Sequence, residues 1–421
     1  MGATPLASDA ERRRGLWLVT VLLLIEFLDE LVDGVMGAAW PAIRAEFQLG
    51  YDEVGLAMSL PVLFCLLLEP ALALWADMGK RRTLVASGGV SFSASLILCA
   101  AAWCQAVFVA SRMLFFPASG AFVNLAQAAL MELEPQRRAV MMARWTLAGS
   151  LGVVVGPLLL AGCSALGWGW RAPFVLMGGL SLAAAAWFWK LTDPNAAPPP
   201  EVEDEEEGSG EEKDEGSEAP SFGAQLWSIV EALRSREVWK WLALLAASNL
   251  LLDILTSLLS LYLVDVRGWS QERAALASSV RAGVGFAGDA LFVVVAARVD
   301  GLRWVRWTAL ASVVFYPIFL LWDHGWVSLG LLGVLGFCGA GWYAVLKAKL
   351  YDALPHRPGL VVAVGAAFEI LEGGVPLGLG VLAEQTSLTA SMWVLLLGPA
   401  LLWIFSRPSA AGTHRSGGAP G

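Results

Sequence analysis

The sequence has 421 residues, of which 57% are hydrophobic and only 15% are charged, and its mean hydropathy is +0.63. A soluble globular domain is about 45–50% apolar and about 25% charged, so this composition excludes an ordinary soluble domain. The net charge of −9 does not indicate an acidic surface, because residues 201–218 alone contain eleven acids and one lysine.

Apolar runs of about 20 residues, each sufficient to cross a hydrocarbon core, recur along the whole chain. We expect twelve membrane-spanning helices, at residues 16–38, 53–75, 83–103, 106–131, 139–161, 171–189, 238–262, 274–297, 304–322, 326–346, 360–382 and 388–406. The first run follows three arginines, but it is long, contains four acids and lacks a small-residue cleavage site. We therefore expect it to remain as helix 1 rather than to be a signal peptide. The fold class predicted is an all-α membrane protein.

Helix 1 contains four acids, Glu26, Asp29, Glu30 and Asp33, at spacings i, i+3, i+4 and i+7. These positions fall within an arc of roughly 100° on one helix face. One acid at the bilayer centre costs about 2.5–3.5 kcal/mol, so four acids facing lipid would cancel most of the apolar gain. That face must look into a watery or protein-lined cavity, where acids that exchange protons suit proton coupling. The alternative is that some of the acids pair with cations or cap backbone groups.

Other predicted spans also contain polar residues that we expect to line this cavity. Helix 4 contains the intramembrane arginine Arg112, for which the helix 1 acids are plausible partners, and we assign it to proton coupling. The substrate cavity is predicted to include Glu69, Asn124, Gln127, Asn249, Asp253, Arg281, Asp289, Glu369 and Glu372. Asp253 or Glu372 is expected to pair with Arg281, although a structural ion pair between helices is an equal alternative for both arginines. Acids outnumber bases here, which favours protons and cationic or neutral substrates over anions.

Residues 191–236 form the one long hydrophilic segment, and their acid-rich, Gly- and Ser-containing composition cannot make a packed domain. We expect a disordered cytoplasmic linker that joins two bundles of six helices, a plan in which the halves are weakly similar. The chain is thus divided into a cytoplasmic N-terminus at 1–15, a bundle at 16–190, the linker at 191–236, a second bundle at 237–406 and a disordered tail at 407–421.

The distribution of Lys and Arg predicts the orientation. If both termini are cytoplasmic, 22 of these residues lie inside and four in outside loops, in agreement with the positive-inside rule. Many tryptophans fall near predicted helix ends, where an interfacial aromatic belt is expected. The five cysteines occur singly in or near apolar runs and are expected to be buried thiols. We expect a multi-pass protein of the plasma (inner) membrane.

Three motifs resemble those of the major facilitator superfamily. Asp77-Met78-Gly79-Lys80-Arg81-Arg82 looks like the loop 2–3 signature, which gates the inward opening in that family. Arg112 resembles the helix 4 arginine linked to proton coupling. Gly152-x-x-x-Gly156-Pro157 matches the helix 5 signature typical of antiporters and is the most specific of the three. The resemblance implies two pseudo-symmetric six-helix bundles, alternating access and a monomer.

Helices 1 and 2 resemble the fosmidomycin-resistance branch of the superfamily in detail. Glu26-Phe27-Leu28-Asp29-Glu30, Pro41 and Glu69-Pro70 stand where that branch typically reads H-F-x-N-D, P and Q-P. Acids therefore replace the His, Asn and Gln of the branch at three positions. Such replacements argue against its anionic phosphonate substrate.

The leading hypothesis is a proton-coupled secondary transporter that exports small organic compounds. Proton-coupled uptake and an uncoupled facilitator of the same fold are alternatives, and a transporter-like membrane receptor is an alternative of another class. An enzyme is not expected, because the three histidines lie in predicted loops or the tail and no metal-ligand spacing occurs. We expect no cofactor and no nucleic-acid partner; the expected partners are a small-molecule substrate, protons and the lipid bilayer.

Overall fold

The computed structural model describes residues 9–77, 81–133, 137–192, 234–296, 298–354, 364, 365, 368 and 371–406. Every long regular element in these residues is a helix. The N-terminal bundle contains six spans, and its fourth span is a chain of three helical segments that includes a π-helical turn. Its elements are α1 (Asp9–Phe47), α2 (Tyr51–Asp77), α3 (Arg81–Ala101), α4 (Gln105–Ser119) with η1 (Gly120–Asn124) and α5 (Leu125–Leu133), α6 (Arg138–Ala165) and α7 (Arg171–Leu191).

The C-terminal bundle also contains six spans, and its first span includes two π-helical turns. Its elements are α9 (Arg236–Asn249) with η3 (Leu250–Ile254), α10 (Leu255–Leu261) and η4 (Tyr262–Val266), α11 (Gln271–Val295), α12 (Gly301–Leu321), α13 (Gly325–Gly339) with α14 (Trp342–Ala353), α16 (Val375–Gln385), and α17 (Leu388–Val394) with α18 (Leu397–Phe405).

The predicted fold class, twelve helices in a membrane, is confirmed. Nine of the spans within the described residues are long and apolar enough to cross a bilayer. The remaining three are the spans that contain α1, α2 and α16. Helix α1 has 39 residues and is longer than the predicted span at 16–38. At 1.5 Å per residue it is about 58 Å long, so it extends well beyond a hydrocarbon core of about 30 Å.

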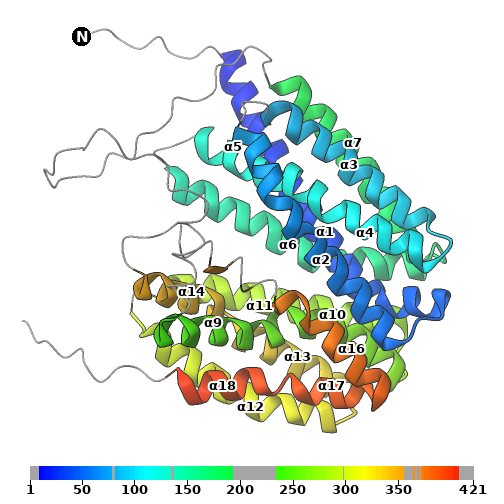
Figure 1. Ribbon diagram of the computed structural model, residues 1–421, viewed down its shortest axis with the longest axis vertical. Helices are drawn as coiled ribbons and strands as arrows, with labels where there is room; N and C mark the ends of the chain where they lie inside the picture. Colours follow the sequence, from blue (N-terminus) through cyan, green and yellow to red (C-terminus); the bar gives the residue numbers. More distant parts are fainter. Residues whose placement is uncertain are drawn as a thin grey trace, which may run out of the picture.

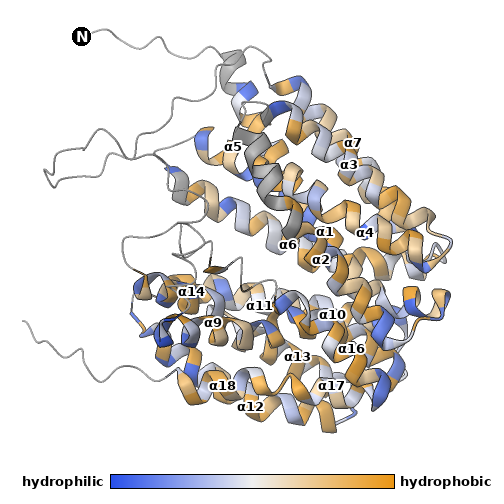
Figure 2. Ribbon diagram, in the orientation of Figure 1, coloured by the Kyte–Doolittle hydropathy of each residue, from blue (hydrophilic) through white to orange (hydrophobic). Residues whose placement is uncertain are grey.

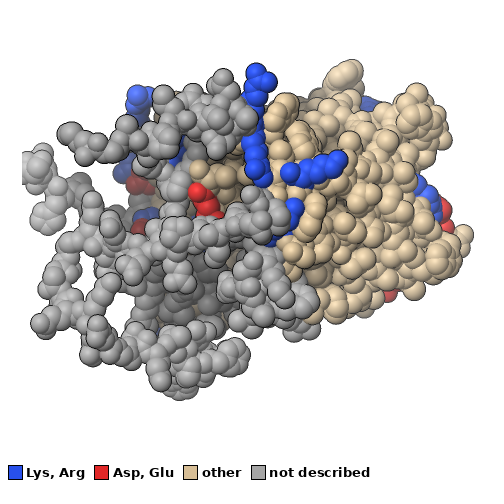
Figure 3. Space-filling view, turned by 90° about the horizontal axis from the view of Figure 1, so that it is seen from above, with Lys and Arg blue, Asp and Glu red and all other residues tan. Residues whose placement is uncertain are grey.

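The outer surface is apolar, as contact with lipid requires. Large hydrophobic side chains are extensively exposed, among them Val293 at 76%, Leu321 at 76% and Trp326 at 81%. Orange residues cover much of the outside of both bundles in Figure 2. Figure 3 shows a mostly uncharged face between charged groups near one end of the molecule and a second charged group at the other end.

Polar caps begin several helices of the C-terminal bundle. Ser235, Ser270, Asp300 and Ser387 each accept a hydrogen bond from a backbone N–H in the first turn of the following helix. Such caps satisfy donors that have no partner within the helix, which is why short polar residues stand at these boundaries. The break between α13 and α14 occurs at Gly341, where φ is +75°.

The two bundles approach each other at one end of the molecule and diverge toward the end where α1 begins and α18 ends (Figure 1). At the closed end, α2 packs on α16 with very small separations: a Cβ at Gly55 would lie 2.5 Å from the carbonyl oxygen of Pro376. The backbone N–H of Leu377 also donates to Ser59 Oγ at 3.0 Å. Close backbone packing therefore seals this end between the bundles.

A polar cluster, here named the latch, reinforces the closed end and consists of Arg44, Tyr51, Asp265 and Glu384. Arg44 Nη1 lies 3.0 Å from Asp265 Oδ2, and the Tyr51 hydroxyl donates to the same oxygen at 3.2 Å. The backbone N–H of Tyr51 donates to Glu384 at 2.8 Å. Burial and the neighbouring Asp265 raise the pKa of Tyr51 to about 12, so this hydroxyl keeps its proton at neutral pH.

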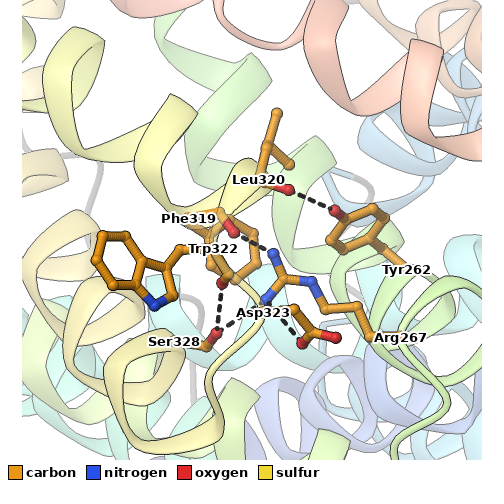
Figure 4. A network of polar contacts seen from close by, with 7 residues as sticks. All are labelled: Tyr262, Arg267, Phe319, Leu320, Trp322, Asp323 and Ser328. Atoms are coloured by element: carbon orange, nitrogen blue, oxygen red, sulfur yellow. Dashed lines mark hydrogen bonds and ion pairs between the residues drawn. The ribbon is translucent and has the colours of Figure 1, made fainter.

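Arg267 anchors the part of the C-terminal bundle that contributes Asp265 to the latch (Figure 4). Its guanidinium donates to the carbonyl oxygen of Phe319 and to Ser328 Oγ, and it lies 3.8 Å from Asp323. The ring of Tyr262 stands beside the guanidinium, and its hydroxyl donates to the carbonyl of Leu320. These contacts fix η4 to the connection between α12 and α13.

Several predicted features lie partly or wholly outside the described residues. Most of the expected linker at 191–236 and all of the tail at 407–421 belong there, as do Gly79 and Lys80 of the loop 2–3 motif. The side chains of Asp77 and Arg81 are likewise outside the description. Arg82 is described: it donates to Thr192 Oγ1 and to the carbonyl of Trp189, and it stacks on that indole at 3.7 Å. Arg82 thereby ties the start of α3 to the end of α7.

All five cysteines are free thiols, and all but Cys104 are buried. This agrees with the prediction except at Cys104, which is half-buried in the short connection between α3 and α4.

Candidate functional site

A cavity of about 530 Å³ lies between the two bundles. Both bundles contribute ionisable groups to its wall, from α1 and α4 on one side and from η3 and α11 on the other. The ionisable residues that line it are Glu30, Asp33, Arg112, Asp253, Arg281 and Asp289. A charged cavity at the interface of two helical bundles is the arrangement in which transporters bind their substrates.

Glycines of α6 hold the acid-bearing part of α1 in place. A Cβ at Gly152 would lie 2.5 Å from the carbonyl oxygen of Phe27, and a Cβ at Gly156 would lie 2.7 Å from that of Leu31. A Cβ at Gly149 would lie 2.6 Å from Glu26 Oε1. The helices can approach this closely only because these residues lack side chains. The Gly152-x-x-x-Gly156 motif thus sets the position of the α1 acids.

The four acids of α1 have different surroundings. Glu26 is buried against α6. Asp29 accepts a hydrogen bond from Ser119 Oγ of α4 at 2.8 Å. Glu30 and Asp33 line the cavity, and the Asp33 side chain is exposed to it. The row of four acids on α1, here named the acid stripe, therefore leads from the interior of the N-terminal bundle into the cavity between the bundles.

Arg112 lines the same side of the cavity as Asp33 and interacts with it electrostatically. Its guanidinium carbon stands 4.4 Å from the ring centre of Phe115 and 5.0 Å from that of Phe116. Within the described part of the chain, Arg112 makes no hydrogen bond or ion pair. The predicted pairing with helix 1 is thus an electrostatic interaction without direct contact, supplemented by cation–π stacking.

Arg281 interacts electrostatically with Asp253, one of its two expected partners, but makes no direct ion pair with it. Its hydrogen bonds go to Thr256 Oγ1 at 2.6 Å and to the carbonyl oxygens of Leu251 and Leu252. These carbonyls belong to the π-helical turn η3, where the wider winding alters the regular hydrogen-bond pattern of the helix. Arg281 therefore satisfies the backbone of the turn that presents Asp253 to the cavity.

A second cavity, of about 670 Å³, adjoins the first; the C-terminal bundle provides most of its wall, Met58, Val62 and Phe116 of the N-terminal bundle provide the rest, and the lining is mainly apolar. Asn249 and Glu372 lie in its wall, and the Asn249 amide donates to Glu372 at 2.6 Å. Asp253 lines both cavities. Asp289, in the first cavity, accepts a hydrogen bond at 2.9 Å from the N–H of Gly341.

The remaining predicted cavity residues lie elsewhere. Asn124 and Gln127, on η1 and α5, line neither cavity, and the Gln127 amide lies 3.8 Å from the Met142 sulfur. The Glu69 side chain and Glu369 fall outside the described residues. No group of three or more His, Cys, Asp or Glu among the residues searched forms a metal site.

Sequence reasoning missed several residues that position the site. Gln271 donates to the carbonyl of Ala38, and Ser279 Oγ donates to the carbonyl of Val154 at 3.1 Å, so both tie α11 to the N-terminal bundle. Neither residue carries a sequence signal, because a lone polar residue in a span is equally compatible with many contacts. Arg44 is one of the four residues that the Lys and Arg distribution places in outside loops, and that distribution does not predict its ion pair with Asp265 in the latch.

Two six-helix bundles around a shared charged cavity define the class of secondary transporters. The sequence matches the family model of the Major Facilitator Superfamily over residues 22–371. The chain belongs to this superfamily of membrane transporters of small solutes and is not an enzyme.

Solved structures share the fold at low identity. A bacterial homolog of the human lysosomal transporter Spinster, in an inward-facing and unoccupied conformation, matches with a TM-score of 0.74 and 18% identity, over 96% of this chain and 98% of that chain. The nucleoside transporter NupG (D323A mutant) matches with a TM-score of 0.70 and 11% identity, over 92% of this chain and 98% of that chain. No curated protein matches the chain.

Proposed function

We propose that this chain is a proton-coupled secondary transporter that exports a small organic solute in exchange for protons. The observation that carries the proposal is the electrostatic interaction of Asp33 and Arg112 in the same wall of the cavity without a direct hydrogen bond. A proton on Asp33 removes the negative charge that attracts the guanidinium, so protonation changes the charge of the site where the solute binds.

The α1 acids supply the coupling and α6 positions them. Glu26, Asp29, Glu30 and Asp33 form a line of carboxyl groups from the N-terminal bundle to the cavity, in close contact with α6. Since a proton and a solute compete for these groups, binding of one favours release of the other, which is antiport. The resemblance of Gly152-x-x-x-Gly156-Pro157 to the antiporter signature supports export.

Both termini are proposed to lie in the cytoplasm, with the protein as a monomer in the plasma (inner) membrane. In that orientation the closed end with the latch faces outward, and the structure is inward-facing. The two bundles then rock about the cavity, and the latch must open for the solute to leave. The loop 2–3 motif, with Arg82 bound to α7, is proposed to control the opposite opening.

The more specific resemblance of helices 1 and 2 to the fosmidomycin-resistance branch stays a prediction, and the comparisons give it no support. The acids Glu26 and Asp29 stand at two of its characteristic positions, and the neighbouring Glu30 and Asp33 line a cavity in which acids outnumber arginines. A phosphonate would be repelled by such a site, so we propose a solute that is not an anion.

Proton movement in liposomes tests this function. Purified protein is reconstituted with a pH-sensitive dye inside, and cationic, neutral and phosphonate compounds are added one at a time. Wild type is compared with Asp33→Asn, Glu26→Gln and, as a control outside the cavity, Glu237→Gln. We expect a transported compound to drive proton flux through wild type and the control, and Asp33→Asn to abolish that flux.

The sign of the flux separates antiport from symport. If a labelled compound crosses the membrane while Asp33→Asn and wild type move no protons, the protein is a facilitator and the coupling assignment is wrong.

A further inference from the structure

Two carboxylates from opposite bundles face the central cavity, and within the described residues neither makes a direct ion pair with a basic side chain. Glu30 of α1 and Asp253 of η3 both line it and interact electrostatically with each other. Within the described residues neither side chain makes a hydrogen bond or an ion pair. The nearby arginines have other contacts, since Arg112 lies on two phenyl rings and Arg281 donates to Thr256 and two backbone carbonyls.

Four acids and two arginines line this cavity, so the acids exceed the bases even though Arg281 attracts Asp253 through space. Two carboxylates that repel each other across an interface hold the bundles apart until a positive charge enters between them. A compact cation, such as an ammonium group, can interact with both at once. Binding such a group draws the two bundles together, which is the step that a rocking transporter needs after loading.

The adjoining second cavity provides a compartment of different chemistry. It shares part of its wall with the first cavity through Met58, Val62, Phe116, Leu252, Asp253 and Pro376. Beyond this shared wall its lining is mainly aliphatic and aromatic, with Leu242, Leu245, Ala246, Ile254, Phe368 and Val375. Lys347 and Glu372 provide one charge of each sign there, and Glu372 also accepts from Asn249. A solute that reaches from Asp253 into this space meets mostly hydrocarbon.

We propose that the transported solute is an amphipathic organic cation, with its ammonium group between Glu30 and Asp253 and its hydrocarbon part in the second cavity. The proposal rests on the transport function proposed above and names its substrate class. The carboxylates select the charge, and the apolar wall selects a solute with a hydrocarbon extension. Anions of the same length are rejected because both Glu30 and Asp253 repel them.

Binding without a proton gradient tests this class directly. Alkyltrimethylammonium ions with butyl, hexyl and octyl chains, below their micellar concentrations, are titrated calorimetrically into protein in lipid nanodiscs at fixed pH. Alkyl sulfates of the same chain lengths are the anionic probes, and empty nanodiscs give the partitioning background. We expect cation affinity to rise by about two- to fourfold per methylene, as burial of hydrocarbon predicts, and the sulfates not to bind.

Two variants separate the head site from the tail site. Asp253→Asn is expected to lower the binding affinity of every ammonium probe by about tenfold, whatever its chain length. Ala246→Trp fills the second cavity and is expected to flatten the dependence on chain length while leaving the butyl probe little changed. Its matched control is Ala243→Trp, the same substitution on the exposed side of the same helix. This control should change neither the dependence of affinity on chain length nor the affinity for the butyl probe.

The outcomes distinguish this inference from the proposed function. If alkyl sulfates bind as well as the cations, or if Ala246→Trp and Ala243→Trp have equal effects, the substrate class is wrong even where proton flux is found with other compounds. If the ammonium probes bind as expected but drive no proton flux in liposomes, the substrate class stands and the proton coupling fails.

Discussion

The two intramembrane arginines belong to different bundles and are held in opposite ways. Arg281 donates to three acceptors on one neighbouring span, so its position is fixed by hydrogen bonds. Arg112 rests against phenyl rings and faces Asp33 through space. The same residue type therefore has two roles: a charge bound by hydrogen bonds supports the backbone, whereas a charge held mainly by a titratable partner responds when that partner is protonated.

The carboxylates show the same contrast. On the N-terminal side, close packing of α1 on the glycines of α6 determines where Glu26 and Glu30 stand. On the C-terminal side, Asp253 stands on a π-helical turn that Arg281 stabilises. One half of the site depends on steric fit and the other on hydrogen bonding, and substitutions can break each half separately.

The largest expected effect is that of Arg281→Leu. It leaves the acceptors of η3 without their donor in a buried place and should destabilise the protein by about 3 kcal/mol. Thermal unfolding in detergent measures the loss. Arg273→Leu, in the same helix but exposed, should cost less than about 0.5 kcal/mol. If Arg281→Leu and Arg112→Leu lower the free energy of unfolding equally, the claim that hydrogen bonds give Arg281 a greater structural role than Arg112 is wrong.

The next effect is that of Gly152→Ala. The added Cβ would stand 2.5 Å from the Phe27 carbonyl oxygen, so α1 and α6 must move apart, at a cost of about 1–3 kcal/mol. Gly162→Ala is the matched control, because a Cβ there meets nothing within 4 Å. Unfolding of the two variants is compared by the same method, and proton flux reports whether the α1 acids have shifted. Indistinguishable variants would show that α6 does not position them.

The smallest effect is expected outside the membrane, at Glu46. Hydrogen bonds from Arg171 and Trp170 lower the pKa of this carboxyl group below 4.5. Its stabilising effect is therefore complete above pH 4.5 and is lost as the pH falls through the lowered value. The melting temperature of wild type should exceed that of Glu46→Gln at pH 6, and the difference should shrink as the pH falls from 4.5 through the lowered pKa of Glu46. A difference that stays constant with pH would assign the effect to packing instead.

The sequence predicts the fold well because the bilayer imposes a simple rule. Each span needs about 20 apolar residues, and this length can be read directly from the chain. The acid stripe of α1 was predicted to face a cavity for the same reason, since four acids do not belong against lipid, and Glu30 and Asp33 line that cavity. The long apolar runs thus predict the spans, and the charged residues within those runs predict which helix faces line a cavity.

Contacts between helices were less predictable. Asp253, an expected partner of Arg281, interacts with it only through space, whereas the direct hydrogen bonds go partly to backbone carbonyls of η3, and a π-helical turn has no clear sequence signature. Asn124 and Gln127 are polar residues in a span like Asn249, yet only Asn249 lines one of the two cavities. The rotation of each helix about its own axis decides this, and packing against neighbours sets that rotation.

The closed end combines two kinds of contact that respond differently to the surrounding solution. Backbone packing at Gly55 is insensitive to dissolved ions. The Arg44–Asp265 ion pair is partly exposed, so dissolved salt screens its attraction; the Debye length is about 8 Å at physiological ionic strength. The glycine contacts thus define how the two bundles fit together, and the charged latch makes the strength of that closure dependent on salt. In the proposed orientation, the ionic strength outside the cell tunes how readily the transporter opens outward.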